Sequence, residues 1–330
     1  MLFLLPLTAL AGWTVAPQML EAQGNLGSAI DDLGQIYAIG GNTAGVGQYA
    51  PDGKVQRFNE SGTGTWQYVA PLNTPRGYLS AASLANGNIL AIGGMDATGS
   101  SLSGAVERYV RSSNTWTPVN SLIVPVASPA VAVSSGTVFV MGGADQVLNN
   151  HAVSTVQCYV TATNSWYINP VPMPGPLSSA RGVTGADGKI YVIGGSTGTS
   201  YVNTVYVYNP ASNTWSTGPS LPSAGCVAAA VAAPDGYIYA VSGYGPGGYT
   251  SGVERYDLSP TGTWQAWDGA VLNARNNSGL EVAPSGYMYL FGGDVAYDRT
   301  ALVEKTLVPE PATLSLLALG GLALLRRRRR

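Results

Sequence analysis

Three arginines in similar local contexts are the residues best suited to hold a charged ligand. Arg76 stands in TPRGYL, Arg181 in SARGVT and Arg275 in NARNNS, each just before an apolar segment. A guanidinium group binds a carboxylate or sulfate through charge-assisted hydrogen bonds. The three are candidates for an anion-binding ring. The alternative is that each arginine bonds a backbone carbonyl or an acidic side chain nearby.

Residues for metal or thiol chemistry are scarce. The chain has one histidine, His151, and two cysteines, Cys158 and Cys226. These are too few for most transition-metal sites or for a disulfide framework. Aspartates that follow glycine doublets have oxygen ligands for a hard cation, but such residues are usually solvated turn residues: Asp96, Asp145 and Asp294. We expect no metal, no cofactor and no disulfide.

The composition excludes several classes of protein. Of 330 residues, 45% are hydrophobic and only 10% are charged, and 43 are glycine. This composition is not typical of a disordered tail or a coiled coil. The net charge is −2, although five of the 16 basic residues form the terminal run. The rest of the chain is acidic, so we expect no binding to nucleic acid.

Two series of residues recur with a common period. Glycine doublets, or a Ser-Gly pair in one case, follow an apolar segment and end at Gly41, Gly94, Gly143, Gly195, Gly243 and Gly293, in steps of 53, 49, 52, 48 and 50. Tryptophans occur at Trp13, Trp66, Trp116, Trp166, Trp215 and Trp264, in steps of 53, 50, 50, 49 and 49. A shared period near 50 indicates a repeat architecture in a single domain.

Each repeat has the pattern of four strands. Turns such as Asn86-Gly87 precede the doublet, and a loop follows it. A third strand carries an aromatic residue, and a fourth carries the tryptophan. On the third strand we expect Glu107-Arg108 and Glu254-Arg255 to be surface pairs. Four-stranded sheets that cannot bury both faces alone pack around an axis as propeller blades.

The doublet, the spaced tyrosine and the spaced tryptophan resemble the Kelch repeat across nearly all of residues 12–308. The resemblance implies an all-β, six-bladed Kelch-type β-propeller. Because Trp13 precedes the first doublet and the last repeat lacks a tryptophan strand, we expect the N-terminal strand to complete the last blade beside Ala301–Leu307. In Kelch propellers that bind acidic peptides, arginines at positions matching the three above contribute contacts.

Some Kelch propellers are enzymes. A galactose-oxidase-like copper site needs two histidine ligands, and His151 stands alone. A sialic-acid mutarotase-like epimerase of the exported type needs an acid or base, such as Glu281, and arginines for the substrate carboxylate. No spacing singles out such a base. We therefore expect a non-enzymatic module that binds a polysaccharide or protein, with the periplasmic sugar epimerase as the alternative.

The two ends of the chain indicate export. Residues 1–11 read as a truncated signal peptide without its basic start, the alternative being a buried first strand. At the other end, Pro309, Glu310 and Pro311 precede an apolar segment over 312–325 and five arginines, Arg326, Arg327, Arg328, Arg329 and Arg330. Residues 309–330 resemble the PEP-CTERM sorting signal of bacterial exported proteins.

The sorting signal implies a partner and a route. In that family, an exosortase-type membrane peptidase processes the Pro-Glu-Pro motif, a short hydrophobic membrane helix and the arginine cluster. The positive-inside rule keeps the arginines in the cytoplasm and places the propeller outside. We expect a precursor that is anchored transiently in the inner membrane and then reaches the cell surface or extracellular matrix.

Overall fold

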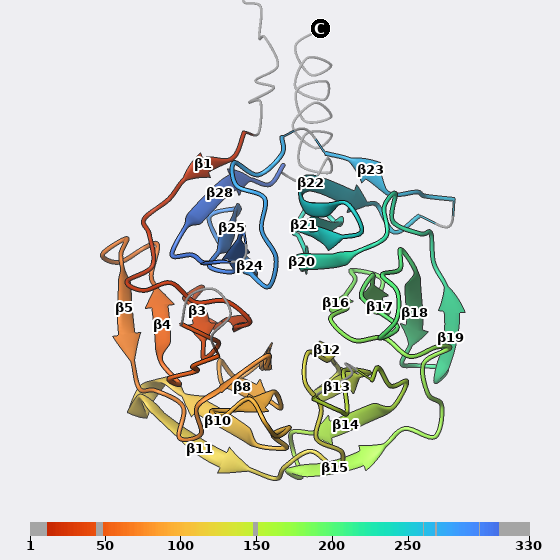
Figure 1. The fold of residues 1–330 in the computed structure, drawn as a ribbon, viewed down its shortest axis with the longest axis horizontal. Coiled ribbons are helices and arrows are strands. Elements are labelled where there is room, and N and C mark those ends of the chain that lie inside the picture. Colours follow the sequence, from red (N-terminus) through yellow and green to blue (C-terminus); the bar gives the residue numbers. More distant parts are fainter. Residues whose placement is uncertain are drawn as a thin grey trace, which may run out of the picture.

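The chain is described by a computed structural model over residues 12–43, 49–147, 151–259, 261–267, 269–296 and 298–309. These residues form six four-stranded antiparallel sheets around a central axis (Figure 1). The all-β, six-bladed propeller predicted from the repeats is therefore confirmed.

The strands of each blade are given from the centre outward. Blade 1 holds β2 (Gly27–Ile30), β3 (Ile36–Ile39), β4 (Val55–Phe58) and β5 (Trp66–Val69). Blade 2 holds β7 (Ser80–Ser83), β8 (Ile89–Ile92), β10 (Val106–Val110) and β11 (Thr115–Val119). Blade 3 holds β12 (Ala130–Ser134), β13 (Thr137–Met141), β14 (Val156–Val160) and β15 (Ser165–Ile168).

Blade 4 holds β16 (Arg181–Thr184), β17 (Ile190–Ile193), β18 (Val205–Asn209) and β19 (Thr214–Thr217). Blade 5 holds β20 (Cys226–Ala232), β21 (Ile238–Gly245), β22 (Gly248–Tyr256) and β23 (Gln265–Ala266). Blade 6 holds β24 (Gly279–Val282), β25 (Tyr287–Phe291), β28 (Val303–Leu307) and β1 (Thr14–Val15).

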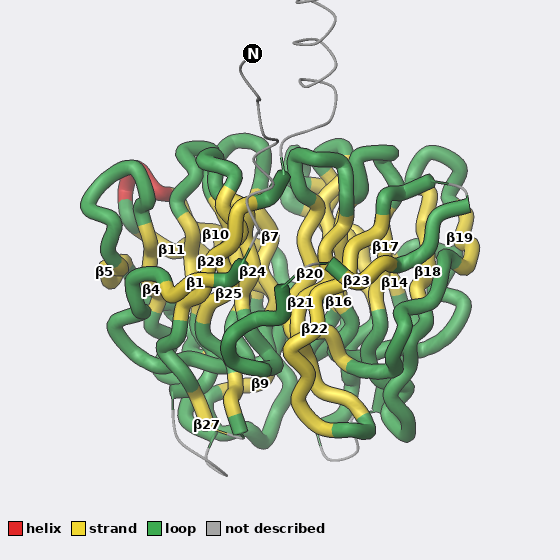
Figure 2. Tube along the Cα trace, turned by 90° about the horizontal axis from the view of Figure 1, so that it is seen from above, coloured by secondary structure: helices red, strands yellow, loops and turns green. Residues whose placement is uncertain are grey.

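Short elements complete the molecule. The ladders β6 (Arg76–Gly77) with β9 (Met95–Asp96), and β26 (Asp294–Val295) with β27 (Asp298–Arg299), pair outside the blades. In the side view, β9, β27 and the tip of the β21–β22 hairpin lie at the same face (Figure 2). One 3₁₀ turn, η1, spans Arg111–Ser113.

Blades pack face to face, so the middle strands are buried on both sides. All four residues of β3 are fully buried, and β8 and β17 are buried at every position as well. Each of six hydrophobic clusters of the described chain joins two neighbouring blades. Burial of this apolar area drives association of the sheets.

The repeated tryptophans hold blades together by a polar contact as well as by packing. The indole N–H of Trp116 donates to the carbonyl of Ala70 in the preceding blade at 2.9 Å. Trp66, Trp166, Trp215 and Trp264 donate to equivalent carbonyls. Trp116 also lies 5.1 Å from Tyr109, centroid to centroid. The recurring spacing of these aromatic residues therefore has a structural explanation.

The N-terminal strand closes the ring. Thr14 pairs with Lys305 and Val15 with Glu304, so β1 becomes the outermost strand of blade 6. Trp13 is 5% exposed and joins the cluster between blades 5 and 6. The predicted closure is confirmed.

A chain of backbone hydrogen bonds links successive blades at the glycine doublets. The N–H of the second glycine donates to a carbonyl of the next blade: Gly41 to Arg76, Gly94 to Val126, Gly143 to Leu177, Gly195 to Gly225 and Gly293 to Gln23. In blade 5, the Ser242 hydroxyl donates to the Arg275 carbonyl at 2.8 Å instead. We call the six accepting residues the seam positions.

The seam positions correct the register assumed from sequence. Arg76 and Arg275 are seam positions, but the equivalent residue of blade 4 is Leu177. Arg181 lies four residues further on, at the first position of β16. In blade 5 the seam position is Gly225.

Several predicted segments lie outside the described residues. These are the signal peptide over 1–11, the C-terminal helix, Glu310, Pro311 and the five terminal arginines. Among the residues that the structure does describe, no helix has the length and apolarity needed to cross a membrane.

Candidate functional site

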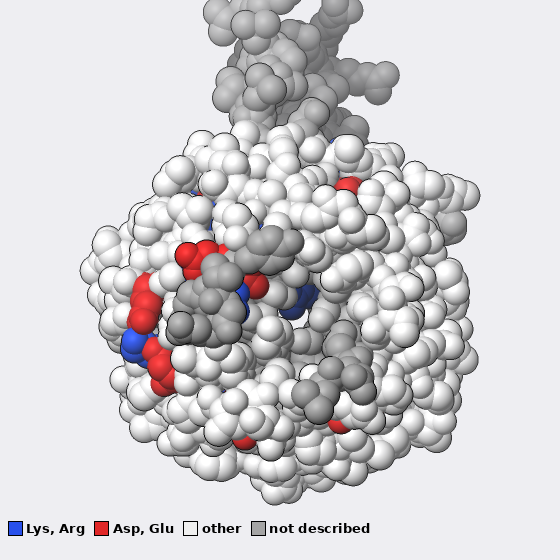
Figure 3. All heavy atoms as spheres, in the orientation of Figure 1, with Lys and Arg blue, Asp and Glu red and all other residues white. Residues whose placement is uncertain are grey.

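The six innermost strands surround a channel along the propeller axis. They are rich in small residues, for example SAAS in β7 and CVAAAVA in β20. Small side chains on six converging strands leave a cavity of about 300 Å³ at the centre. A space-filling view along the axis shows the hollow with Lys or Arg atoms inside it, on a face with few other charges (Figure 3).

The channel wall is mostly hydroxyl groups and small apolar groups, with two charged side chains. Ser28, Ser83 and Thr184 are among the lining residues, as are Arg181 and Glu281. Hydroxyl groups both donate and accept hydrogen bonds, and they suit a ligand with many hydroxyls. The channel is therefore the strongest candidate for a binding site.

Arg181 enters the channel from blade 4. Its side chain is partly exposed, and its Nε and Nη2 donate to the carbonyls of Val227 (3.2 Å) and Ala228 in blade 5. No acidic side chain of the described residues pairs with it, and burial away from water lowers its pKa. Its positive charge is therefore available to an anion in the channel.

Glu281 enters the same cavity from blade 6. Burial raises the pKa of its carboxyl to about 7, and a hydrogen bond from Ser28 opposes part of that rise. Neither Arg181 nor Glu281 shifts the pKa of the other. Glu281 can hold or release a proton near neutral pH, as an acid–base group must.

A ring of left-handed backbone residues narrows one end of the channel. Its members have φ between 49° and 56° and are Asn25, Tyr78, Ser128, Ser179 and Asn277. Each lies two residues after a seam position, and neighbours are joined by N–H to carbonyl bonds of 2.8–3.2 Å. In blade 5 the equivalent residue, Val227, continues β20 instead. Arg181 bonds the Val227 carbonyl and so occupies the gap in this ring.

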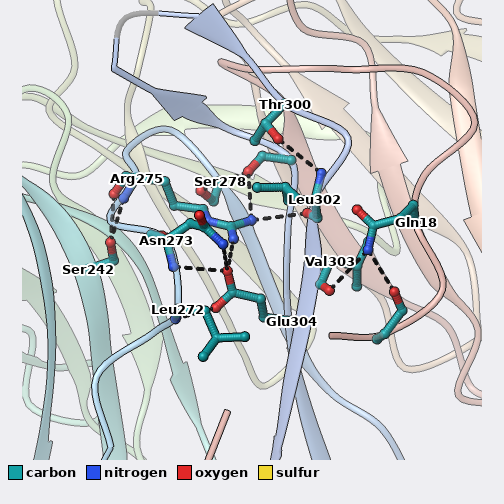
Figure 4. A network of polar contacts seen from close by, with 12 residues as sticks. Gln18, Ser242, Leu272, Asn273, Arg275, Ser278, Thr300, Leu302, Val303 and Glu304 are labelled. Atoms are coloured by element: carbon teal, nitrogen blue, oxygen red, sulfur yellow. Dashed lines mark hydrogen bonds and ion pairs between the residues drawn. The ribbon is translucent and has the colours of Figure 1, made fainter. Parts of the chain in front are cut away.

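The structure does not bring the three predicted arginines together. Arg76 is fully buried within blade 2, where its Nη1 lies 2.5 Å from Glu107 Oε1. It also donates to the carbonyls of Thr74 and Ala91 at 2.8 and 3.0 Å. Arg275 is fully buried in blade 6 and forms the same kind of ion pair with Glu304 (Figure 4). Of the three arginines, only Arg181 lines the channel.

The expectation that Glu107 lies at the surface is wrong. Glu107 is 1% exposed and accepts hydrogen bonds from the backbone N–H groups of Asn73 and Thr74 besides pairing with Arg76. A repeated Val-Glu-Arg or Val-Glu-Lys triplet is the signal that could have located this position, at Val106, Val253 and Val303. The alternation of polar and apolar residues along the strand could not have located it, because neighbouring blades cover both faces of these strands.

The remaining candidates have local partners. Asp145 lies 2.6 Å from His151, Asp294 pairs with Arg299, and Asp96 accepts hydrogen bonds within its own turn. No group of three or more potential metal ligands occurs in the described part of the chain. Cys158 and Cys226 are free, buried thiols.

Comparison with known families finds matches across the chain. The KLHDC2/KLHL20/DRC7 Kelch-repeats domain matches residues 129–308, and the Kelch motif matches residues 76–123. The PEP-CTERM protein-sorting motif matches residues 307–330.

Similar proteins include two Kelch-like proteins of mammals and beta-scruin. Mouse Kelch-like protein 35 is 32% identical over 160 residues, which is 48% of this chain and 26% of that protein. Human Kelch-like protein 38 is 31% identical over 187 residues, which is 56% of this chain and 30% of that protein. Beta-scruin of Limulus polyphemus is 25% identical over 259 residues, which is 73% of this chain and 28% of that protein. The chain thus spans less than a third of each of these relatives.

A solved structure shares the architecture. The structure of YjhT superposes with a TM-score of 0.74 at 15% identity and covers 89% of this chain and 97% of that one. At this identity the likeness concerns the fold.

Proposed function

Because the chain belongs to the family of Kelch-repeat domains and carries a PEP-CTERM sorting motif, we propose that it is an exported binding module without catalytic activity. The ligand is an anionic polysaccharide, one unit of which enters the central channel. The observation that carries this proposal is the channel lined by hydroxyls, with Arg181 lacking an acidic partner among the described residues.

The chemistry of the channel favours an acidic sugar. A cavity of about 300 Å³ suits a small group rather than a broad protein surface. Arg181 offers charge-assisted hydrogen bonds to a carboxylate or sulfate. Serine and threonine hydroxyls bind sugar hydroxyls, and protonated Glu281 is a further donor.

A glycan array probed with the full chain in detergent tests this function. We expect binding to uronate-containing or sulfated glycans and weak binding to neutral ones. Arg181→Gln should remove that preference, whereas Lys189→Gln, an exposed residue paired with Asp187, should leave it unchanged. Equal binding of neutral and acidic glycans by the wild type would contradict the proposal.

Export and sorting form the second part of the proposal. The precursor is held in the inner membrane by the C-terminal helix and arginines, is cut by an exosortase-type peptidase, and reaches the surface or extracellular matrix. Replacing Pro309, Glu310 and Pro311 with alanine should retain the protein in the membrane fraction. Unchanged release into the medium would show that the motif is not needed for sorting.

A sugar epimerase is the second candidate function, and Glu281 is the observation that favours it. A carboxyl with a pKa of about 7 inside the channel can act as an acid and as a base, with Arg181 holding the substrate carboxylate. The test is the rate of anomer interconversion of sialic acid, followed by NMR. A rate above background that Glu281→Gln abolishes would favour the enzyme over the binding module.

A further inference from the structure

The seam arginine of blade 6 shows what surrounds a guanidinium group in this fold. Arg275 donates to the carbonyls of Asn273 (3.2 Å), Gly292 (3.4 Å) and Leu302 (3.0 Å), and it pairs with the Glu304 carboxylate (Figure 4). The carboxylate neutralises the charge, and the carbonyls accept the remaining hydrogen bonds. Blade 2 holds Arg76 in a similar way.

Blade 5 keeps the carboxylate but has no arginine at its seam position. Its seam position is Gly225, which has no side chain. Val241 pairs with Val253 as Phe291 pairs with Val303, so Glu254 corresponds to Glu304. The register of blade 5 shifts between Val241 and Gly243, so the other equivalents of the Arg275 partners are assigned by their place in the repeat. The four equivalents are Ser223, Ser242, Gly252 and Glu254.

A cavity occupies the place of the absent side chain. It encloses about 230 Å³, and Gly225 together with all four equivalents, Ser223, Ser242, Gly252 and Glu254, lines it. This volume is several times the roughly 30 Å³ that a water molecule takes up in the liquid. The cavity shares no lining residue with the central channel.

The charge at this cavity is uncompensated. Glu254 forms no hydrogen bond or ion pair with the described residues, and burial alone raises its pKa. The adjacent Arg255 lies over the ring of Tyr237, 4.6 Å from its centroid. Thus Glu254 is not the surface partner of Arg255 that the sequence suggested. A half-buried carboxylate without a partner is unfavourable, and a bound cation would stabilise it.

The other blades without a seam arginine do not carry this charge. Blade 1 pairs Gln23 with Gln56 at 2.8 Å, and blade 3 has Gln157 at the position of Glu254. Blade 4 has Tyr206 there. Among the six blades as the structure describes them, blade 5 alone keeps the carboxylate without a cation from the described residues.

We propose that the blade 5 cavity is a binding site for the guanidinium group of an arginine side chain on a protein partner. Glu254 pairs with the guanidinium, and the carbonyl-bearing residues around it accept the other N–H groups as their equivalents do for Arg275. Arginine suits this site better than lysine because its planar group offers several donors in a fixed arrangement. This site goes beyond the proposed channel function and uses none of its residues.

Calorimetric titration of the full chain in detergent tests the proposal. The probe is the peptide acetyl-Gly-Arg-Gly-amide, and its matched control contains citrulline, which has the same shape without the charge. We expect the arginine peptide to bind at least about tenfold more tightly than the citrulline peptide, because a charge-assisted bond is lost. Equal affinities would overturn the proposal.

Two variants locate the binding. Glu254→Gln keeps the size of the side chain and should weaken binding of the arginine peptide by about tenfold or more. Glu281→Gln alters the channel carboxylate and should leave it unchanged, so failure of the channel function and failure of this site are distinguishable. Agmatine, a free guanidinium compound, tests the source: affinity higher than that of the peptide would favour a small guanidinium compound and contradict a protein partner.

Discussion

Arg76 and Glu107 form an ion pair whose side chains are 0% and 2% exposed. Removing one partner of such a pair leaves a buried charge, at a cost of about 3–5 kcal/mol. We predict that Arg76→Ala lowers the free energy of unfolding in urea by this amount. Lys189→Ala, which removes an exposed pair with Asp187, should cost less than about 1 kcal/mol.

The same pair can be exchanged for the one in blade 1. There, Gln23 and Gln56 occupy the equivalent positions and hydrogen-bond each other. The double change Arg76→Gln with Glu107→Gln should recover more than half of the stability lost in Arg76→Ala. A double variant as unstable as the single one would show that charge is not the reason for the loss.

Glu281 predicts a pH dependence of stability. Its pKa is raised from 4.5 to about 7 in the folded protein, so between these pH values the unfolded chain loses the proton while the folded chain keeps it. Stability therefore falls as pH rises from about 4.5 to 7, by an amount on the order of 2 kcal/mol after screening by channel water. Thermal melts of Glu281→Gln should lack this decline. A wild-type melting temperature with the same pH profile as the variant would contradict the prediction.

Single residues were the least predictable part of the sequence. The sequence aligns Arg181 with Arg76 because both precede a glycine, and only the inter-blade hydrogen bonds reveal the four-residue offset. The charge of Glu107 and Glu254 predicts a surface position for both. The buried position of Glu107 depends on Arg76, which lies over thirty residues away in the sequence. The position of Glu254 depends on the absence of such an arginine from blade 5.

At the scale of elements, each doublet combines a hydrogen bond to the next blade with a close backbone approach inside its own blade. A Cβ atom on Gly94, at φ +104°, would lie 2.5 Å from the carbonyl oxygen of Gly77. No side chain is tolerated at that separation, so substitution must also displace the bond from Gly94 N–H to the Val126 carbonyl. The doublets could be predicted from sequence because this constraint recurs with every repeat.

Gly94→Ala tests the constraint, with Gly188→Ala as the matched control. Gly188 also has positive φ, +78°, but nothing lies within 4 Å of its added Cβ. The control should lower the free energy of unfolding only by the cost of placing alanine in a left-handed backbone conformation, about 1–2 kcal/mol. Gly94→Ala should cost at least about 2 kcal/mol more in urea unfolding, since it adds a steric clash. Similar losses in both variants would mean that close approach is not the constraint.

At the scale of the whole molecule, the ring is closed by residues from both ends of the described chain. Trp13 is buried between blades 5 and 6, whereas its neighbour Val15 is 63% exposed. Trp13→Ala should therefore lower the free energy of unfolding by about 3–5 kcal/mol, and Val15→Ala by less than about 0.5 kcal/mol. Urea unfolding of both variants gives the comparison. A tryptophan variant as stable as the wild type would show that the closing strand contributes little.

The architecture was predictable because repetition supplies many copies of one signal, and an incomplete first and last copy imply closure. The binding site was not predictable, because the lining of the channel depends on which residue of each inner strand faces the axis. The guanidinium cavity depends on a side chain that is absent, Gly225, and no local motif marks such an absence.

The position of β28 between β25 and β1 has a mechanical consequence for a tethered protein. Tension applied beyond Val308 pulls along β28, and ladder hydrogen bonds run across that direction, so those on both flanks resist together. Optical tweezers pulling from residue 309 should therefore record a higher rupture force for the wild type than for Ala16→Pro, which removes the hydrogen bond from the Ala16 N–H to the Val303 carbonyl on one flank. A tail joined in this way keeps the ring intact while the membrane-held precursor is under tension, before the tail is cut.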